Sequence, residues 1–183
     1  MAINRHETAI PGVLILESRV FHDSRGYFLE SYNEAAFCEV GVDLCWKQDN
    51  VSLSNQNVVR GLHYQLVQPQ TKLVRVIRGA VFDVAVDIRR SSPTFGKHVA
   101  VELREGDGRA FLVPAGFAHG FAAMEPDTVF QYKVSDFYNP TGDRTLLWND
   151  PHLGIHWPLA EKDASVSAKD LLGKRLAEAD LFD

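Results

Sequence analysis

A chain of 183 residues with 45% hydrophobic and 23% charged residues can bury one substantial core, so we expect a single domain over residues 1–183. The formal net charge of −5 argues against nucleic-acid binding and against binding to an anionic membrane surface. Residues 1–7 lack an apolar signal-peptide core, and no stretch reaches the roughly 18 apolar residues of a membrane helix, so we expect a cytoplasmic protein.

Most of the chain carries strand signals, which are short runs rich in Val, Ile and Phe separated by Gly, Pro, Asn and Asp. These runs predict strands at residues 13–17, 48–53, 73–77, 81–88, 99–103, 110–113, 128–135 and 145–148. Helices are expected at residues 33–40 and near the C-terminus, where Ser167 and Asp170 have capping-box-like spacing. The pattern favours a mainly β fold, a jelly-roll β-barrel or sandwich with a few short helices.

The clearest strand signal lies at residues 81–88. One face would carry only apolar side chains, while Asp83 and Asp87 fall on the other. This period of two predicts a strand that is buried on one face and solvated on the other. The apolar set is Phe82, Val84, Val86 and Ile88.

The segment at residues 58–65 is the densest in polar chemistry. If it is extended, His63 shares a face with Gly61 and Gln65, and Arg60 points the opposite way. A histidine beside a glycine inside a barrel leaves room for a ligand, although a hydrogen-bonded core histidine fits equally well. Lys72 begins the next predicted strand, either as a solvated rim residue or as a cation that stabilises negative charge on an oxygen.

The same region excludes the usual metal site of cupin proteins. Metal-binding cupins resemble G-x5-H-x-H-x3,4-E followed by P-x-G-x2-H, and His119 ends a version of the second motif here. However, Gln65 stands at the second histidine position, and Lys72 lies where the glutamate would be. Two imidazoles beside an ammonium make a poor cation site, so we expect no metal. Cys38 and Cys45 lack CxxC spacing and are expected to be reduced.

Two tyrosines on the predicted strand at 128–135 and just beyond it are further candidates. Tyr132 and Tyr138 are six residues apart, so they share a face if the strand stays regular. Core packing is the ordinary role of such residues. A phenol beside a histidine base and a cation is also a plausible proton donor.

Taken together, these motifs resemble those of the dTDP-4-dehydrorhamnose 3,5-epimerases. The resemblance is carried by Arg-Gly-Leu-His-Tyr-Gln at 60–65 and Pro-Ala-Gly-Phe-Ala-His-Gly-Phe at 114–121. Further segments that match in the family's order are residues 21–30, 48–50, 72–75, 132–138, 147–151 and 167–170. The resemblance implies a cupin jelly roll, a homodimer that needs no cofactor, and a dTDP-linked 4-keto-6-deoxyhexose as substrate.

The resemblance also implies a role for each matching residue. His63 is similar to the family's general base, Asp170 to its carboxylate partner, Lys72 to the residue that stabilises the enolate oxygen, and Tyr132 to the proton donor. The positions that resemble nucleotide-sugar contacts are Arg25, Glu30, Gln48, Asn50, Arg60, His119, Tyr138, Asp143 and Lys169. These residue types suit the removal of a proton from a carbon next to a ketone. That step needs a base of near-neutral pKa and a cation to stabilise the enolate oxygen.

Three alternatives stay open at this point. An enzyme that inverts only C3 or only C5 would need the same base, lysine and tyrosine. A sugar-nucleotide-binding cupin without activity would have no use for the acid–base set. A metal-dependent dioxygenase would need ligands that the first motif lacks.

Overall fold

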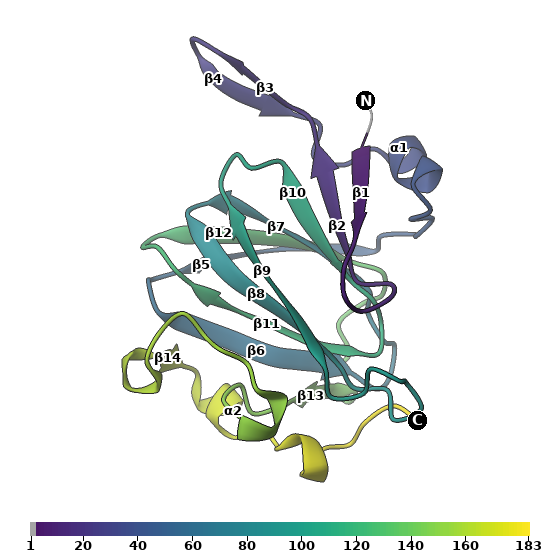
Figure 1. The fold of residues 1–183 in the computed structure, drawn as a ribbon, viewed down its shortest axis with the longest axis vertical. Helices are drawn as coiled ribbons and strands as arrows, with labels where there is room; N and C mark the ends of the chain where they lie inside the picture. Colours follow the sequence, from purple (N-terminus) through teal and green to yellow (C-terminus); the bar gives the residue numbers. More distant parts are fainter. Residues whose placement is uncertain (1–2) are drawn as a thin grey trace.

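The computed structural model describes residues 3–183, and most of its elements are strands (Figure 1). Met1 and Ala2, the start of the segment expected to lack a signal-peptide core, lie outside the described residues. The first sheet has the order β1 (Ile3–Glu7), β2 (Leu14–Ser18), β10 (Arg109–Val113), β7 (Lys72–Arg78), β12 (Thr128–Val134) and β5 (Gln48–Ser54). The second has the order β13 (Asp143–Thr145), β6 (Val58–Gln65), β11 (Phe117–Ala123), β8 (Ala80–Asp87) and β9 (His98–Arg104), with β14 (Ser165–Val166) paired to β6.

The two sheets pack face to face as an open sandwich rather than closing into a barrel. Val74 and Phe130 of the first sheet meet Val81 and Phe121 of the second in one buried cluster. Burial of this apolar surface is the main force that holds the sheets together. The expected mainly β fold is confirmed. Of the two predicted architectures, a β-barrel and a β-sandwich, the structure has the sandwich.

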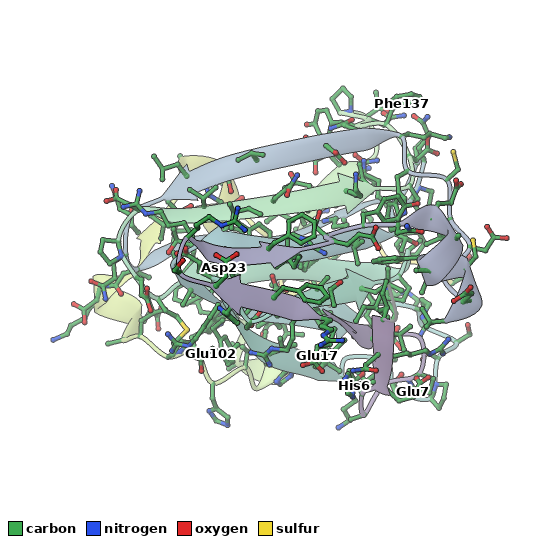
Figure 2. The ribbon with its side chains drawn as sticks, turned by 90° about the horizontal axis from the view of Figure 1, so that it is seen from above. His6, Glu7, Glu17, Asp23, Glu102 and Phe137 are labelled. Carbon is green, nitrogen blue, oxygen red and sulfur yellow. The ribbon has the colours of Figure 1, made fainter. Side chains whose placement is uncertain are left out.

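A separate hairpin, β3 (Val20–Asp23) and β4 (Gly26–Leu29), projects from the sandwich beyond the end of β2 (Figure 1). Its aromatic residues are exposed, with Phe28 63% and Tyr27 43% accessible. In the view of Figure 2, Asp23 marks this hairpin, and His6 of β1 lies beside Glu17 of β2. The His6 Nε2 and Glu17 Oε2 atoms are 3.0 Å apart, which ties together the outermost strand pair.

The helix expected at 33–40 is α1 (Glu34–Glu39), with Asn33 as N-cap and Val40 as C-cap. The expected C-terminal helix is shorter than its pattern suggested. The structure has one turn, α2 (Ala168–Leu171), and short 3₁₀ turns at Pro151–Leu153, Glu161–Asp163 and Leu176–Glu178. Ser167 does cap α2, since its hydroxyl accepts from the Asp170 amide, but the Asp170 carboxylate turns away to another partner. Within residues 3–183, no helix combines the length and apolar composition needed to cross a membrane.

Seven of the eight expected strands match observed strands within two residues at each end. The exception is 145–148, where pairing with β6 ends at Thr145. Beyond it, Leu146 still exchanges two backbone hydrogen bonds with Leu62 and is fully buried, so its apolar character reflects packing rather than a longer strand.

The prediction that β8 is solvated on one face is wrong. Asp83 and Asp87 are both fully buried, because they face the interior of the sandwich beside Val81 and Ala85. The opposite face of β8 is buried too, beneath the C-terminal segment, where Val84 and Val86 pack near Leu146 and Leu153. Because the strand is covered on both faces, each carboxylate that it carries needs hydrogen bonds or an opposite charge to offset its loss of contact with water.

Candidate active site

Two adjoining cavities open between the sheets, and three polar residues line both. His63 of β6, Lys72 of β7 and Tyr132 of β12 face a cavity of about 190 Å³ and a neighbouring one of about 110 Å³. Arg60, His119 and Phe130 complete much of the first cavity. Tyr138, Asp143 and Lys169 lie around the second. The sequence-predicted residues that line these cavities therefore come from both sheets and from α2.

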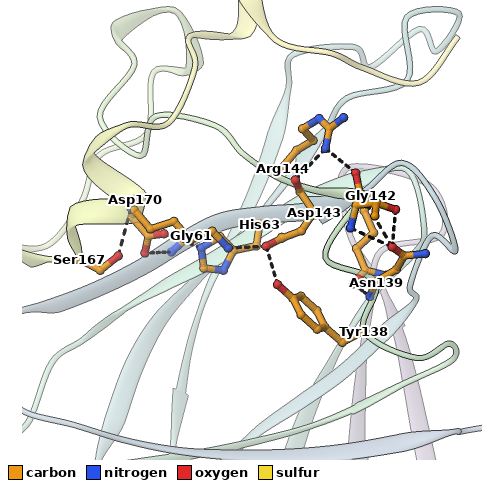
Figure 3. Close-up of polar contacts among 12 residues, drawn as sticks. Gly61, His63, Tyr138, Asn139, Gly142, Asp143, Arg144, Ser167 and Asp170 are labelled. Carbon is orange, nitrogen blue, oxygen red and sulfur yellow. Dashed lines mark hydrogen bonds and ion pairs between the residues drawn. The ribbon is translucent and has the colours of Figure 1, made fainter.

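His63 and Asp170 form a buried hydrogen-bonded pair. His63 Nε2 lies 2.7 Å from Asp170 Oδ1, and the Gly61 amide donates to Asp170 Oδ2 at 3.2 Å (Figure 3). Burial opposes the charge on Asp170, but the hydrogen bonds from His63 and Gly61 outweigh it, so the pKa of Asp170 lies below its usual value. An ionised carboxylate only accepts, so the shared proton belongs to Nε2 and the basic lone pair of the ring lies on Nδ1.

Lys72 is buried rather than solvated, with 8% of its surface exposed. Its ammonium donates to the His63 carbonyl oxygen at 3.1 Å. Burial lowers the pKa of Lys72 to about 8, although attraction by Asp83 and Asp143 opposes the shift. The lysine is therefore a cation held beside the histidine and largely shielded from water. A cation in such a site stabilises a developing negative charge more strongly than one in water.

Tyr132 approaches the cavities from the opposite wall to His63. The tyrosine belongs to β12 of the first sheet, and the histidine to β6 of the second. Burial raises the pKa of Tyr132, an effect that Arg60 partly opposes, so the phenol keeps its proton at neutral pH. A base on one wall and a protonated phenol on the other suit proton removal from one face of a carbon and delivery to the other.

Sequence reasoning missed the partner of His119. His119 Nε2 lies 2.8 Å from Oδ1 of Asp83, which the alternation had placed on a solvated face. Burial lowers the pKa of His119, although Asp83 opposes the shift. One signal could have identified this acid. The residues that share its face of β8, such as Val81 and Ala85, are apolar rather than polar.

A chain of contacts ties the loop after β12 to α2. Asp143 Oδ2 accepts from the Tyr138 hydroxyl at 3.1 Å and also from the Lys169 ammonium (Figure 3). Burial and the bond to Asp143 both raise the pKa of Tyr138. The loop is also held at its backbone, because Gln48 Oε1 accepts from the Tyr138 amide at 3.1 Å.

Gln65, noted in the sequence only as a departure from the metal motif, holds the same loop. It is buried, donates to the carbonyl of Phe137 and accepts from the amide of Asn139. The position that carries a metal ligand in other cupins thus anchors a loop here. In the described part of the chain, no group of three His, Cys, Asp or Glu side chains could hold a metal ion, and Cys38 and Cys45 are free and exposed.

The expected opposite orientation of Arg60 and His63 is wrong, since both line the first cavity. The cause is a register shift in the pairing of β6 with β11, where His63 faces His119 but Arg60 faces Phe121. Four residues of β6, 60–63, therefore oppose three residues of β11, 119–121, and the alternation of sides is interrupted. Arg60 is held by Ser54 Oγ and the Leu53 carbonyl.

Four predicted contact residues do not line either cavity. Gln48 and Asn50 lie on β5 and bind each other at 2.8 Å. Arg25 lies at the tip of the projecting hairpin and pairs with Asp23. Glu30 follows the hairpin and accepts from Asn33 at 3.2 Å. Within a single chain, the structure therefore brings together nine of the thirteen predicted site residues and leaves these four outside.

The family model for dTDP-4-dehydrorhamnose 3,5-epimerase matches residues 7–178. The chain is 51% identical over 175 residues to the dTDP-4-dehydrorhamnose 3,5-epimerase of Pseudomonas aeruginosa, covering 95% of this chain and 96% of the relative.

Among solved structures, the dTDP-6-deoxy-D-glucose-3,5-epimerase of Legionella pneumophila, in complex with dTDP-4-keto-L-rhamnose, superposes with a TM-score of 0.93 at 44% identity. That match covers 97% of this chain and 95% of the other. A 3'-monoepimerase from Streptomyces bikiniensis, in complex with dTDP-quinovose, has a TM-score of 0.88 at 32% identity, covering 94% and 87%. The chain belongs to the dTDP-4-dehydrorhamnose 3,5-epimerase family.

Proposed function

We propose that this chain converts dTDP-4-dehydro-6-deoxy-D-glucose into dTDP-4-dehydro-L-rhamnose by inverting C3 and C5. The observation that carries the proposal is the placement of His63 with Asp170 on one wall of a cavity, with Lys72 and Tyr132 on the other. The relatives at 45–51% identity with nearly full coverage support the same activity.

In the proposed reaction, Nδ1 of His63 removes the proton from a carbon next to the C4 ketone. The C–H electron pair moves into a C–C double bond, and the carbonyl electrons move to oxygen, which becomes an enolate. Asp170 stabilises the imidazolium that forms, and the Lys72 ammonium stabilises the enolate oxygen. Tyr132 then delivers its proton to the opposite face of the same carbon, and the enolate electrons re-form the C4 carbonyl. The phenolate regains a proton from solvent and His63 releases its proton to solvent, which resets both groups. C3 and C5 both flank the ketone, so one set of groups serves both inversions.

The remaining cavity residues suit a nucleotide sugar. Arg60 supplies a guanidinium for diphosphate oxygens, and His119 adds a polar group at the same cavity. The Tyr138 ring, 56% exposed at the mouth of the second cavity, offers a stacking surface for the thymine. Asp143 and Lys169 hold that tyrosine in place.

A homodimer is the assembly that we propose. Several exposed apolar side chains lie on the hairpin and on β5, which is an edge strand: Phe28, Val51 and Leu53 are 61–67% accessible. Such surfaces mark association sites. Arg25, at the tip of the projecting hairpin, lines neither of the two cavities described above, and in a dimer it could reach the cavity of the second copy. Analytical ultracentrifugation tests the dimer, and cell fractionation tests the expected cytoplasmic location.

The deciding experiment is proton NMR of the purified protein with dTDP-4-dehydro-6-deoxy-D-glucose in deuterated water. Deuterium at both C3 and C5, with the product trapped by a reductase, is the expected result. Deuterium at one carbon alone would identify a mono-epimerase with the same groups, a possibility raised by the Streptomyces bikiniensis structure. Binding of dTDP without exchange at either carbon would leave a sugar-nucleotide-binding protein and overturn the proposal.

A further inference from the structure

Asp83 is a fully buried carboxylate with an incomplete set of partners. Its Oδ1 atom accepts from His119 at 2.8 Å, while within the described residues its Oδ2 atom is buried and has no hydrogen-bond partner. Asp87, four residues along the same face of β8, is equally buried but is fully satisfied by Arg89, Ser92 and Thr94. A buried carboxylate with so few hydrogen bonds needs a nearby positive charge to remain ionised.

Lys72 is the buried cation placed to supply this charge, because it lines the same cavity as His119, the hydrogen-bonded partner of Asp83. The hydrogen-bond acceptor of Lys72 itself is a neutral carbonyl, that of His63. Attraction by Asp83 opposes the lowering of the Lys72 pKa by burial. The ionisable groups around Lys72 on the packed elements are Asp83 on β8, His119 on β11, Arg60 and His63 on β6, Tyr132 on β12, Asp143 on β13 and Lys169 on α2.

We propose that Asp83 is a positioning residue, whose buried carboxylate keeps Lys72 charged and holds His119 with its proton on Nε2. The proposal rests on the function proposed above, in which the Lys72 ammonium stabilises an enolate. Without Asp83, the cavity that Lys72 shares with Arg60 and His119 would have one negative charge fewer beside it. The lysine, which burial already disfavours as a cation, would then lose its proton most readily.

The test compares Asp83→Asn with Asp87→Asn, because both remove a fully buried carboxylate from the same face of β8. The ε-carbon of Lys72 is followed by NMR in protein labelled with ¹³C-lysine, with the signal assigned from Lys72→Arg. In Asp83→Asn the titration midpoint of Lys72 should fall by about one pH unit or more. The alkaline limb of kcat/KM should move to lower pH by the same amount. In Asp87→Asn both should stay where they are in the parent protein.

An unchanged Lys72 midpoint in folded Asp83→Asn would overturn the proposal, even if turnover fell, because a structural role alone lowers activity without moving the titration. If Asp83→Asn fails to fold, the parent protein provides the test. The ¹³C signal of the Asp83 carboxyl should shift with the same midpoint as the Lys72 ε-carbon, and the absence of that shared inflection would overturn the proposal. Both titrations need no substrate, so a failure of the epimerase function would be seen separately, as absent deuterium exchange.

Discussion

The Nε2 atom of His63 lies 2.7 Å from Oδ1 of Asp170, although the two residues are 107 positions apart in the chain. The histidine comes from the middle of the second sheet, and the aspartate from a single helical turn that packs against β6. Ser167 caps that turn and so helps to fix the aspartate. In the proposed reaction, this pair leaves the Nδ1 lone pair of His63 free to act as the base.

Removing either member of this pair should nearly abolish turnover. His63→Ala loses the base, and Asp170→Asn replaces an acceptor with a group that no longer stabilises the imidazolium. Each should lower kcat by about 10²- to 10⁴-fold, measured by deuterium incorporation. His152→Ala is the matched control, since His152 also pairs with an aspartate, Asp150, but its side chain is 72% exposed and outside the cavities. Near-normal kcat in His63→Ala would remove the assignment of the base.

Activity should fall as the pH rises through about 8, because the Lys72 ammonium loses its proton there. The same burial costs stability. The folded-state pKa of Lys72 is below the ordinary lysine value of 10.5, so the unfolded chain binds more protons between pH 8 and 10.5 and stability rises across that window.

Lys72→Met should abolish most turnover, because methionine carries no charge to stabilise the enolate oxygen. Thermal unfolding checks that the variant is folded, and kcat measures the loss. Lys133→Met, which breaks a surface pair with Asp49, is the control and should change neither by much. A Lys72→Met protein that is folded and fully active would contradict the assigned role.

Tyr132→Phe should separate proton removal from proton delivery. The base and its carboxylate remain, so the substrate should still exchange its proton with deuterated solvent. The inverted product should form about 10²-fold more slowly, because the phenol that protonates the opposite face is missing. Parallel measurement of washout and product by NMR checks this. Equal loss of both would mean that Tyr132 acts before or during proton removal.

Asp143→Ala should raise KM for the substrate more than it lowers kcat. Asp143 anchors the Tyr138 hydroxyl and the Lys169 ammonium, and neither contact reaches His63 directly. We expect KM to rise about tenfold with kcat within a factor of about three. Asp180→Asn, which loses surface contacts with Arg144 and Lys174, should leave KM unchanged. A fall in kcat at constant KM would instead place Asp143 in the reaction itself.

Gly61→Ala should disrupt the site through the backbone. A Cβ at position 61 would lie 2.6 Å from the Gly120 Cα atom, and Gly61 has φ +121°, so the two strands would have to separate. The melting temperature and kcat should both fall strongly. Gly154→Ala is the comparison, because nothing lies within 4 Å of its Cβ position, and it should cost only about 1 kcal/mol. A Gly61→Ala protein as stable as Gly154→Ala would refute the close approach.

Local patterns in the sequence were enough to predict the mainly β fold, most strand positions and α1. Turn residues and the alternation of apolar side chains depend on the few residues around them, so they can be read without the fold. The resemblance to the family, carried by the order of the motifs, predicted His63, Lys72, Tyr132 and Asp170 as one set. In the structure three of them line the two cavities, and Asp170 is hydrogen-bonded to His63.

The tertiary structure decided what covers each face and which distant residues meet. Alternation in β8 could not reveal that the C-terminal segment covers its outer face, and so it misplaced Asp83. A register shift between two strands, which is a property of the pair, brought Arg60 to the side of His63. The capping-box-like spacing of Ser167 and Asp170 predicted a C-terminal helix, but the structure has only a single turn there, with Leu172 83% exposed just beyond it. Each of these outcomes depends on contacts between segments far apart in the chain, which no local pattern contains.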